Sequence, residues 1–589
     1  MLKLSARRGC PIAGAAVLGC LGWWLVGVTS PVLVGADLSD DRAVALPPFM
    51  VEEMAKGPPW RFAEAMGYEI LSRCDDAITR RVVEAHHRMH GLLAEMLPGS
   101  LRFTVAAPRS LILYDEQLQP ASSQEVIAQV MRSDRGVEAS NDVPALGLGR
   151  GMRMPLAVPR FSFLPNLRLW DRDAMSVFMI VRRDDFDADR LSLTQDYVTF
   201  LVKNRLPALP PWFASGILKL FSQTTFARDR LTLAPLEWIS EVHSAAVKNN
   251  PAAAPAVRPL GEFLLNKLSP PVELPSFDPI QAWQAQAALF VRWGLDADKG
   301  AHREALWKFV ELSATVGATE KNFVDCFGFG YEDALPRLVV YRSAALNRAI
   351  SFKPKGALKN PPLVLRNASD GEIARIKGDW ERMEVPYVKA ISPDLAPKYL
   401  AQARKTLRRA YDRDNRDPRL LAVMGLCEND AGNEVGAREF LEAAVRLGPV
   451  RPRANYELAR LRFQEMCAHP AESAGRLSLP QMVEVLTPLF AARAALPPLP
   501  EVYELIGEVW GHGASPPTRG HLSVLDEGVR LFPRRTGLVL LAAELYLRSG
   551  FREEAGVFAD IATRSASDAP ALARVAALTR ALAENPTPP

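Results

Sequence analysis

Two groups of side chains in this chain have the residue types and spacing that metal ions use. His86 and His90 stand four residues apart, so on a helix both imidazoles would share one face, with Glu84 nearby. No glutamate follows His86, so the His-Glu-x-x-His pattern of a metallopeptidase helix is absent there. Four aspartates within residues 184–189 could coordinate calcium, but they lack the EF-hand spacing. We favour a polar helix face for the histidines and a solvated loop with a helix N-cap for the aspartates.

Other patterns that indicate chemistry are missing from the sequence. There is no Gly-x-Ser-x-Gly, no P-loop and no dinucleotide fingerprint. Four cysteines lie beyond residue 36, and their spacing indicates neither a zinc ribbon nor a disulfide framework, although one disulfide could form.

Residues 193–221 are the most informative segment, because two helix-like runs flank a proline-framed tryptophan. Gln195, Asp196 and Thr199 lie on the first run, and Ser215 lies on the second. This layout resembles the peptidase-MA-like branch of the gluzincin zinc peptidases. In that family a His-Glu-x-x-His helix supplies two zinc ligands and a general base, and a later helix supplies a third ligand.

The resemblance extends beyond the catalytic positions and covers roughly residues 100–345. Trp212 and Gly216 match the family's Trp-x-x-Glu-Gly element, and residues 283–293 and 323–341 are similar to its later helices. It implies an α+β domain over residues 59–350, in which Trp212 and Gly216 are structural.

The substitutions within the motif decide the expected chemistry. Gln195, Asp196 and Thr199 stand where the family has His, Glu and His, and Ser215 replaces the third ligand. Gln, Thr and Ser are poor zinc ligands, and without a metal a water keeps its high pKa. We therefore expect no metal, no cofactor and no catalysis, which would make this domain a pseudoenzyme. The alternative is an active hydrolase with an atypical site, for example Asp196 with ligands from residues 184–189.

The first 36 residues have the features of an export signal. A basic start is followed by an apolar stretch and by a small-residue cleavage site at residues 34–36. The alternative is an uncleaved anchor, because residues 11–36 carry no charge and could span a bilayer. We expect export, most simply to the periplasm of a Gram-negative bacterium, or else attachment to its inner membrane through residues 11–36. A polar linker over residues 37–58 would follow.

The pattern of apolar residues predicts the elements of residues 59–394. A helix is expected over residues 60–97, and residues 117–168 are irregular. Residues 351–394, which contain several prolines, read as a connector. The predicted strands are 102–106, 110–114 and 175–182, and the predicted later helices are 283–295, 302–316 and 333–346.

From residue 395 to 589 the sequence becomes rich in Ala and Leu and shows an internal repeat. Counted from Pro418, apolar and small residues fall at the positions of a 34-residue tetratricopeptide (TPR) unit. The pattern recurs in neighbouring units and ends in a capping helix over residues 568–585, which predicts four to five helix pairs. The expected packing residues are Gly425, Ala437, Ala444, Pro449, Gly507, Ala543, Ala555 and Ala562.

These observations predict an α+β gluzincin-like region followed by an all-α TPR-type solenoid. The formal net charge is +4, and three of those charges lie in the leader, so residues 37–589 carry +1. That balance gives no case for binding nucleic acid or an anionic membrane surface. We expect a non-catalytic binding or scaffold protein whose TPR-like concave surface holds a protein or peptide partner.

Overall fold

The computed structural model describes the protein over much of its length and leaves several internal ranges aside. The described residues are 43–46, 49–52, 57–97, 108–118, 163–181, 202, 205–227, 229–239, 257–265, 279–354, 356, 360, 362–471, 475–566 and 568–584. Within these ranges, none of the helices combines the length and the apolar character that a membrane crossing requires.

A mixed β-sheet forms the centre of the N-terminal region. In the described part of the chain its strand order is β11-β3-β4-β5-β7-β6. β4, β5 and β7 run parallel to one another, whereas the outer strands pair antiparallel. The strands are β3 (Arg61–Ala65), β4 (Tyr68–Ser72), β5 (Arg109–Asp115), β6 (Phe163–Trp170), β7 (Met175–Val181) and β11 (Arg366–Asn367).

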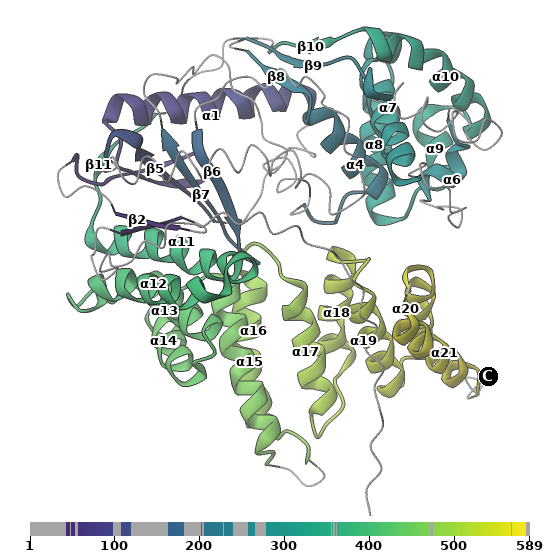
Figure 1. Ribbon diagram of the computed structural model, residues 1–589. Helices are drawn as coiled ribbons and strands as arrows, with labels where there is room; N and C mark the ends of the chain where they lie inside the picture. Colours follow the sequence, from purple (N-terminus) through teal and green to yellow (C-terminus); the bar gives the residue numbers. More distant parts are fainter. Residues whose placement is uncertain are drawn as a thin grey trace, which may run out of the picture. The chain divides into compact units, whose positions relative to one another are not determined.

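Helices cover both faces of this sheet. Side chains alternate between the two faces along each strand, so neighbouring residues of one strand belong to different cores. In β5, Leu111 and Leu113 belong to the core that contains helix α1 (Asp76–Met96). Ile112 and Tyr114 belong to a separate core with helix α11 (Asp370–Ile391). Figure 1 shows α1 and α11 on opposite sides of the sheet. Burial on both faces explains the unbroken apolar runs 111–114 in β5 and 177–181 in β7.

The predicted strands at 110–114 and 175–182 are confirmed as β5 and β7, whereas the predicted helix over 60–97 is wrong in its first part. Residues 61–72 form the hairpin β3–β4, and its turn places Met66 and Gly67 at positive φ. The helix begins only at Asp76, where the Asp75 carboxylate caps the N–H of Ile78. Strand β6 lies in a stretch expected to be irregular. The predicted strand at 102–106 lies outside the described residues.

A helical region with a small sheet follows. The predicted helices at 283–295, 302–316 and 333–346 are confirmed as α7, α8 and α10, and three short strands pair in the order β10-β9-β8. The elements are α4 (Pro211–Phe221), β8 (Thr224–Phe226), β9 (Leu231–Leu233), α6 (Leu260–Leu264), α7 (Pro279–Gly300), α8 (Arg303–Thr315), α9 (Glu320–Phe327), α10 (Tyr331–Asn347) and β10 (Ile350–Phe352).

The C-terminal region is an array of helix pairs, as the repeat predicted. α13 and α15 begin at Pro418 and Pro452, which are 34 residues apart. The helices are α12 (Ala396–Tyr411), α13 (Pro418–Asp430), α14 (Glu434–Leu447), α15 (Pro452–Ala468), α16 (Leu479–Ala494), α17 (Pro500–His512), α18 (Arg519–Leu531), α19 (Thr536–Arg548), α20 (Arg552–Ser565) and α21 (Ala569–Glu584).

Small residues lie where paired helices approach each other. A Cβ on Gly425 would come within 2.6 Å of Leu441 in α14, and one on Gly507 within 2.7 Å of Leu541 in α19. Pro449 is exposed in the loop before α15. The fully buried alanines of the repeat pattern are Ala437, Ala444, Ala543, Ala555 and Ala562.

Two segments expected to be connections contain regular structure. Residues 351–394 hold the 22-residue helix α11, which packs on α12 as the first helix of the array and also covers the sheet. Residues 37–58 hold a hairpin of β1 (Ala43–Leu46) and β2 (Phe49–Glu52). α11 was missed because five of its charged residues are buried, which disrupts the apolar pattern: Arg375, Lys377, Glu381, Arg382 and Glu384.

Candidate functional site at the junction of sheet and helical array

Only part of the predicted motif falls among the described residues. Gln195, Asp196 and Thr199 lie outside them, whereas Ser215 is half-buried on α4. On the same helix, Trp212 is fully buried and its ring stacks on Phe309 at 5.6 Å.

Gly216 allows α4 to lie directly against α7. A Cβ at this position would be 2.5 Å from the carbonyl oxygen of Ala287, a distance that no other residue type could accept without movement of the backbone. The Trp-x-x-Ser-Gly element therefore acts in helix packing.

The histidine pair of α1 does not form a metal site with other described residues. No group of three His, Cys, Asp or Glu suited to a metal ion occurs in the described ranges. His86 is buried rather than on the polar helix face that the sequence suggested. Burial, together with repulsion from His86 and Arg109, lowers the pKa of His90 to about 3. His90 is therefore neutral at physiological pH.

The turn between β6 and β7 is bound by arginines from the array. Asp171 and Asp173 in this turn are buried. Asp171 pairs with Arg382 of α11 at 2.5 Å and with Arg453 of α15 at 2.5 Å. Burial alone would raise the pKa of the Asp171 carboxyl, but the arginines hold it well below its usual range. We call this group of residues, completed by Arg451, the junction network.

Asp173 also caps helix α15. The N-cap residue of that helix is Arg451, which has no side-chain acceptor and makes no capping hydrogen bond. Asp173 accepts a hydrogen bond from the backbone N–H of Arg453 at 2.8 Å and from Arg451 Nε at 2.8 Å. A carboxylate at a helix N-terminus satisfies free N–H groups and interacts favourably with the helix dipole. A residue of the sheet region thus supplies the N-terminal cap of a helix in the array.

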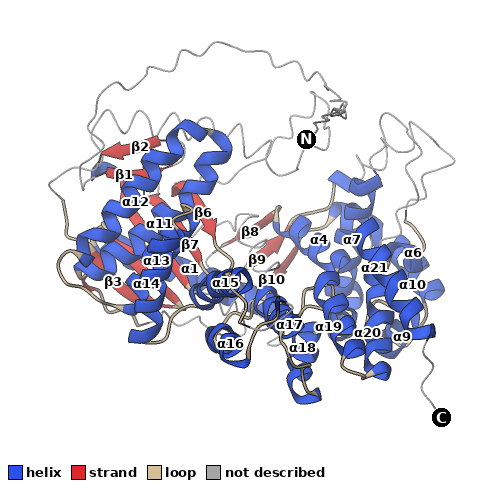
Figure 2. Cartoon of the chain, turned by 90° about the horizontal axis from the view of Figure 1, so that it is seen from below, coloured by secondary structure: helices blue, strands red, loops and turns tan. Residues whose placement is uncertain are grey.

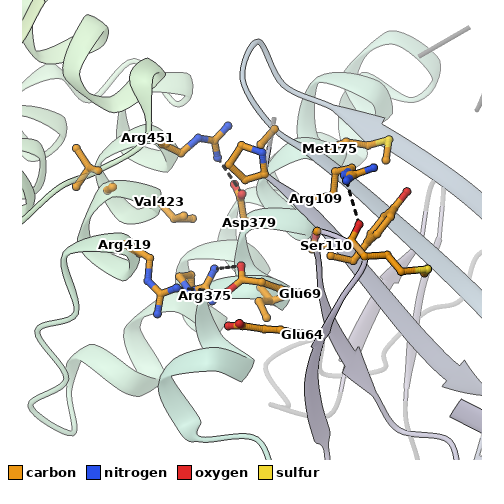
Figure 3. Close-up of a pocket in the computed structure, with 18 of the residues that line it drawn as sticks. Glu64, Glu69, Arg109, Ser110, Met175, Arg375, Asp379, Arg419, Val423 and Arg451 are labelled. Atoms are coloured by element: carbon orange, nitrogen blue, oxygen red, sulfur yellow. Dashed lines mark hydrogen bonds and ion pairs between the residues drawn. The ribbon is translucent and has the colours of Figure 1, made fainter. Parts of the chain in front are cut away.

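A cavity of about 630 Å³ opens beside the junction network (Figure 3). One wall consists of the β3–β4 turn and the first residues of β5 and β7, and the other consists of α11, α13 and the start of α15. Its volume is in the range of sites that bind small ligands or a peptide side chain with its backbone. The apolar lining residues include Ala65, Met175, Ile376, Ala422 and Val423.

The polar lining of the cavity consists of paired charges with a small positive excess. Four arginines and three carboxylates line it. Arg375 binds Glu69 through both terminal nitrogens at 2.6 and 2.7 Å, and Arg451 binds Asp379 at 3.0 Å. Arg419 is the most exposed of these three arginines and contacts Glu69 only at 3.3 Å. The carboxylates therefore orient guanidinium donors that a ligand would meet.

Catalytic chemistry has little support in this cavity. Ser110, the serine that lines it, has its Oγ 2.6 Å from Ser176 Oγ, and a second serine is no general base. The arrangement suits recognition of a ligand by hydrogen bonds and apolar contact.

Sequence reasoning missed the whole site. The only local sign was the charged turn at residues 171–173 between two apolar strands.

Comparisons with known proteins give distant structural likenesses. No family model matches the chain, and no curated protein matches it in sequence. A thermophilic TPR protein of Thermus thermophilus is 17% identical, with a TM-score of 0.25, over 34% of this chain and 99% of that one. PilF of Pseudomonas aeruginosa is 16% identical, with a TM-score of 0.25, over 35% and 89% of the two chains. Yeast Tom70 is 13% identical, with a TM-score of 0.26, over 55% and 63%.

These TM-scores are low, so the class of the protein rests on its own residues. The helix pairs, the 34-residue spacing and the small residues between helices define a TPR-type array. This array is joined through α11 to a three-layer α/β region.

Proposed function

We propose that this protein is a non-catalytic binding protein of the bacterial envelope that holds a protein or peptide partner at the junction cavity. The observation that carries the proposal is the cavity of about 630 Å³ lined by oriented arginines and apolar side chains. Its array wall comes from α11, α13 and the segment that leads into α15. These three are the first helices of consecutive pairs, which is where TPR-type arrays present a binding surface.

The lining favours a peptide segment with a carboxylate next to an apolar side chain. Arg419 is about half exposed, and its long contact with Glu69 is a weak one that a ligand carboxylate could replace. Ala422 and Val423 follow on the same helix and offer apolar contact. The ligand would therefore bind by one charge-assisted contact and by burial of apolar surface.

We propose the absence of zinc-dependent catalysis because the side chains at the family's ligand positions are unsuited to zinc. Gln195 and Thr199 replace the two histidines of the family pattern, and Ser215 replaces the glutamate. These side chains are poor ligands for zinc. The predicted leader over residues 1–36 supports export, with attachment through residues 11–36 as the alternative.

Selection of peptides on the purified full-length protein would test the binding role. We expect a phage-displayed random peptide library to yield sequences with an acidic residue beside an apolar one. Arg419→Ala should weaken the selected peptides at least tenfold. Arg574→Ala is the matched control, because Arg574 lies on α21 and pairs with Glu544. Equal effects of the two variants, or selected peptides without acidic residues, would contradict the proposal.

The alternative of an atypical hydrolase needs its own measurement. Stoichiometric metal in the purified protein, together with chelator-sensitive cleavage of a broad peptide mixture, would replace the binding role by an enzymatic one. We expect neither.

A further inference from the structure

Strand β1 of the hairpin β1–β2 packs against α11 and α12 of the helical array, and Figure 2 shows the hairpin beside α12. We call the surface that these two helices present to β1 the groove. Strand β1 lies between α11 and α12, and its four residues are only 1–4% exposed. In the described part of the chain the hairpin pairs with no other strand. A two-stranded hairpin is marginally stable alone, so the groove supplies most of its order.

The groove recognises the backbone of β1 through side-chain donors on both helices. The carbonyl of Ala43 accepts from Lys377 Nζ at 3.0 Å and from Gln402 Nε2 at 3.5 Å. Trp380 Nε1 donates to the carbonyl of Ala45 at 3.4 Å. The Tyr399 hydroxyl donates to the carbonyl of Leu46. Contacts to carbonyl groups are independent of the peptide's own side chains, so they suit any extended segment.

The side chains of β1 set the remaining requirements. Val44 and Leu46 enter the apolar core around Trp380, whereas Ala45 packs against Val388 and Tyr399. Aliphatic residues therefore alternate with a small residue that fits closely between the helices. A charged residue at position 44 or 46 would be buried without a partner.

The floor of the groove is polar, which a purely structural contact does not require. Glu381 and Glu384 are fully buried one turn apart on α11, with Lys377 on the same helix. Burial, and then repulsion from Glu381, raises the pKa of Glu384 well above its usual range. Buried ionisable side chains of this kind cost stability compared with apolar side chains, and specificity of recognition is one reason to keep them.

We propose that the groove between α11 and α12 is a second peptide-binding site, which the chain's own strand β1 fills in the absence of a partner. Its ligand is an extended segment of a partner protein that alternates aliphatic and small residues. This site is separate from the junction cavity and does not depend on the ligand proposed there.

The site can be tested with a full-length variant whose strand β1 can no longer occupy the groove. Val44→Asp combined with Leu46→Asp should expel the strand, because two carboxylates cannot be buried there. The probe is a fluorescein-labelled peptide of residues 41–52, DRAVALPPFMVE. We expect the double variant to bind this peptide at least tenfold more tightly than the wild-type chain. The same peptide with both aspartates should not bind.

A third substitution locates the bound peptide. Gln402→Leu in the double variant should weaken peptide binding about tenfold, whereas Gln464→Leu, on an exposed position of α15, should not. Equal binding to wild type and double variant, or no effect of Gln402→Leu, would overturn the proposal. Peptides selected at the junction cavity should bind the double variant unchanged, so failure of one site is distinguishable from failure of the other.

Hydrogen exchange on the wild-type chain provides a second test, which stands even where the double variant does not fold. Amides of residues 43–46 and 49–52 should exchange by local opening at least 100-fold faster than those of β5 and β7. Exchange at the same rate as these core strands would show that the hairpin never leaves the groove, which would overturn the proposal.

Discussion

Asp173, in the turn between β6 and β7, accepts a hydrogen bond at 2.8 Å from the backbone N–H of Arg453, which lies 280 residues later in the chain, and so caps helix α15. The cap is fully buried and shares its carboxylate with Arg451. One side chain therefore links the sheet to the array both by charge and by the satisfaction of a helix terminus.

Asp173→Ala should lower the free energy of unfolding by about 2–4 kcal/mol, because it removes one of the three carboxylates that pair with the buried guanidinium of Arg451 and leaves α15 without its cap. Urea unfolding followed by circular dichroism measures this loss. The matched control is Asp229→Ala, since Asp229 pairs with Arg230 on the surface. A loss below about 1 kcal/mol for Asp173→Ala would show that the junction network adds little to stability.

Trp380→Ala should destabilise the sheet and the array together. The Trp380 ring lies 5.2 Å from that of Phe178 in β7, while its helix packs on α12. The cavity left behind should cost about 3–5 kcal/mol. Far-ultraviolet circular dichroism and hydrogen exchange of β5 should report one shared transition. Separate transitions for the sheet and for α13–α20 would mean that α11 does not couple them.

Gly425→Ala should destabilise the array by about 1–3 kcal/mol, because the new Cβ would lie 2.6 Å from Leu441. Gly556→Ala is the control on α20, where nothing lies within 4 Å of the added methyl group. That variant should be neutral or stabilising by up to about 1 kcal/mol, since alanine favours a helix over glycine. Thermal unfolding of both variants gives the comparison, and equal shifts would argue against close helix pairing at Gly425.

His90 should make the protein less stable as the pH falls below about 6.5. Its pKa is lowered to about 3 in the folded chain, so between these two values only the unfolded state binds the proton. The stability that neutral His90 contributes therefore falls by about 1.4 kcal/mol for each pH unit as the pH drops from 6.5 toward 3. Urea unfolding at pH 7, 6 and 5 should give a shallower slope for His90→Leu than for wild type. Identical slopes would show that His90 takes up its proton in the folded state as well.

Helices of the array could be predicted from the sequence because their apolar spacing is local. The same reasoning failed for residues 61–72, where a turn at Met66 and Gly67 with positive φ interrupts an apolar run that also fits a helix. It failed for α11 because the partners of its buried charges lie far away. Arg382 pairs with Asp171, and Lys377 binds the carbonyl of Ala43.

The junction cavity lay beyond prediction for a related reason. Its walls come from segments that are hundreds of residues apart, such as Glu69 and Arg419. The Trp212 and Gly216 element was recognisable because it lies within one helix. Helical spacing is a property of a short segment, whereas a cavity between segments depends on the tertiary arrangement.

Helix α11 both covers the sheet and begins the helical array, and this affects how the chain can fold while it is being synthesised. The sheet is complete as far as β7 at Val181, but the helix that covers its second face begins at Asp370. At roughly 5–20 residues per second, the intervening stretch of about 190 residues takes roughly 10–40 s to synthesise. During that interval Phe178 and Ile180, which later pack against Trp380, have no cover from α11. In a nascent chain this apolar face of the sheet therefore waits for the first helix of the array before it can be buried as in the finished structure.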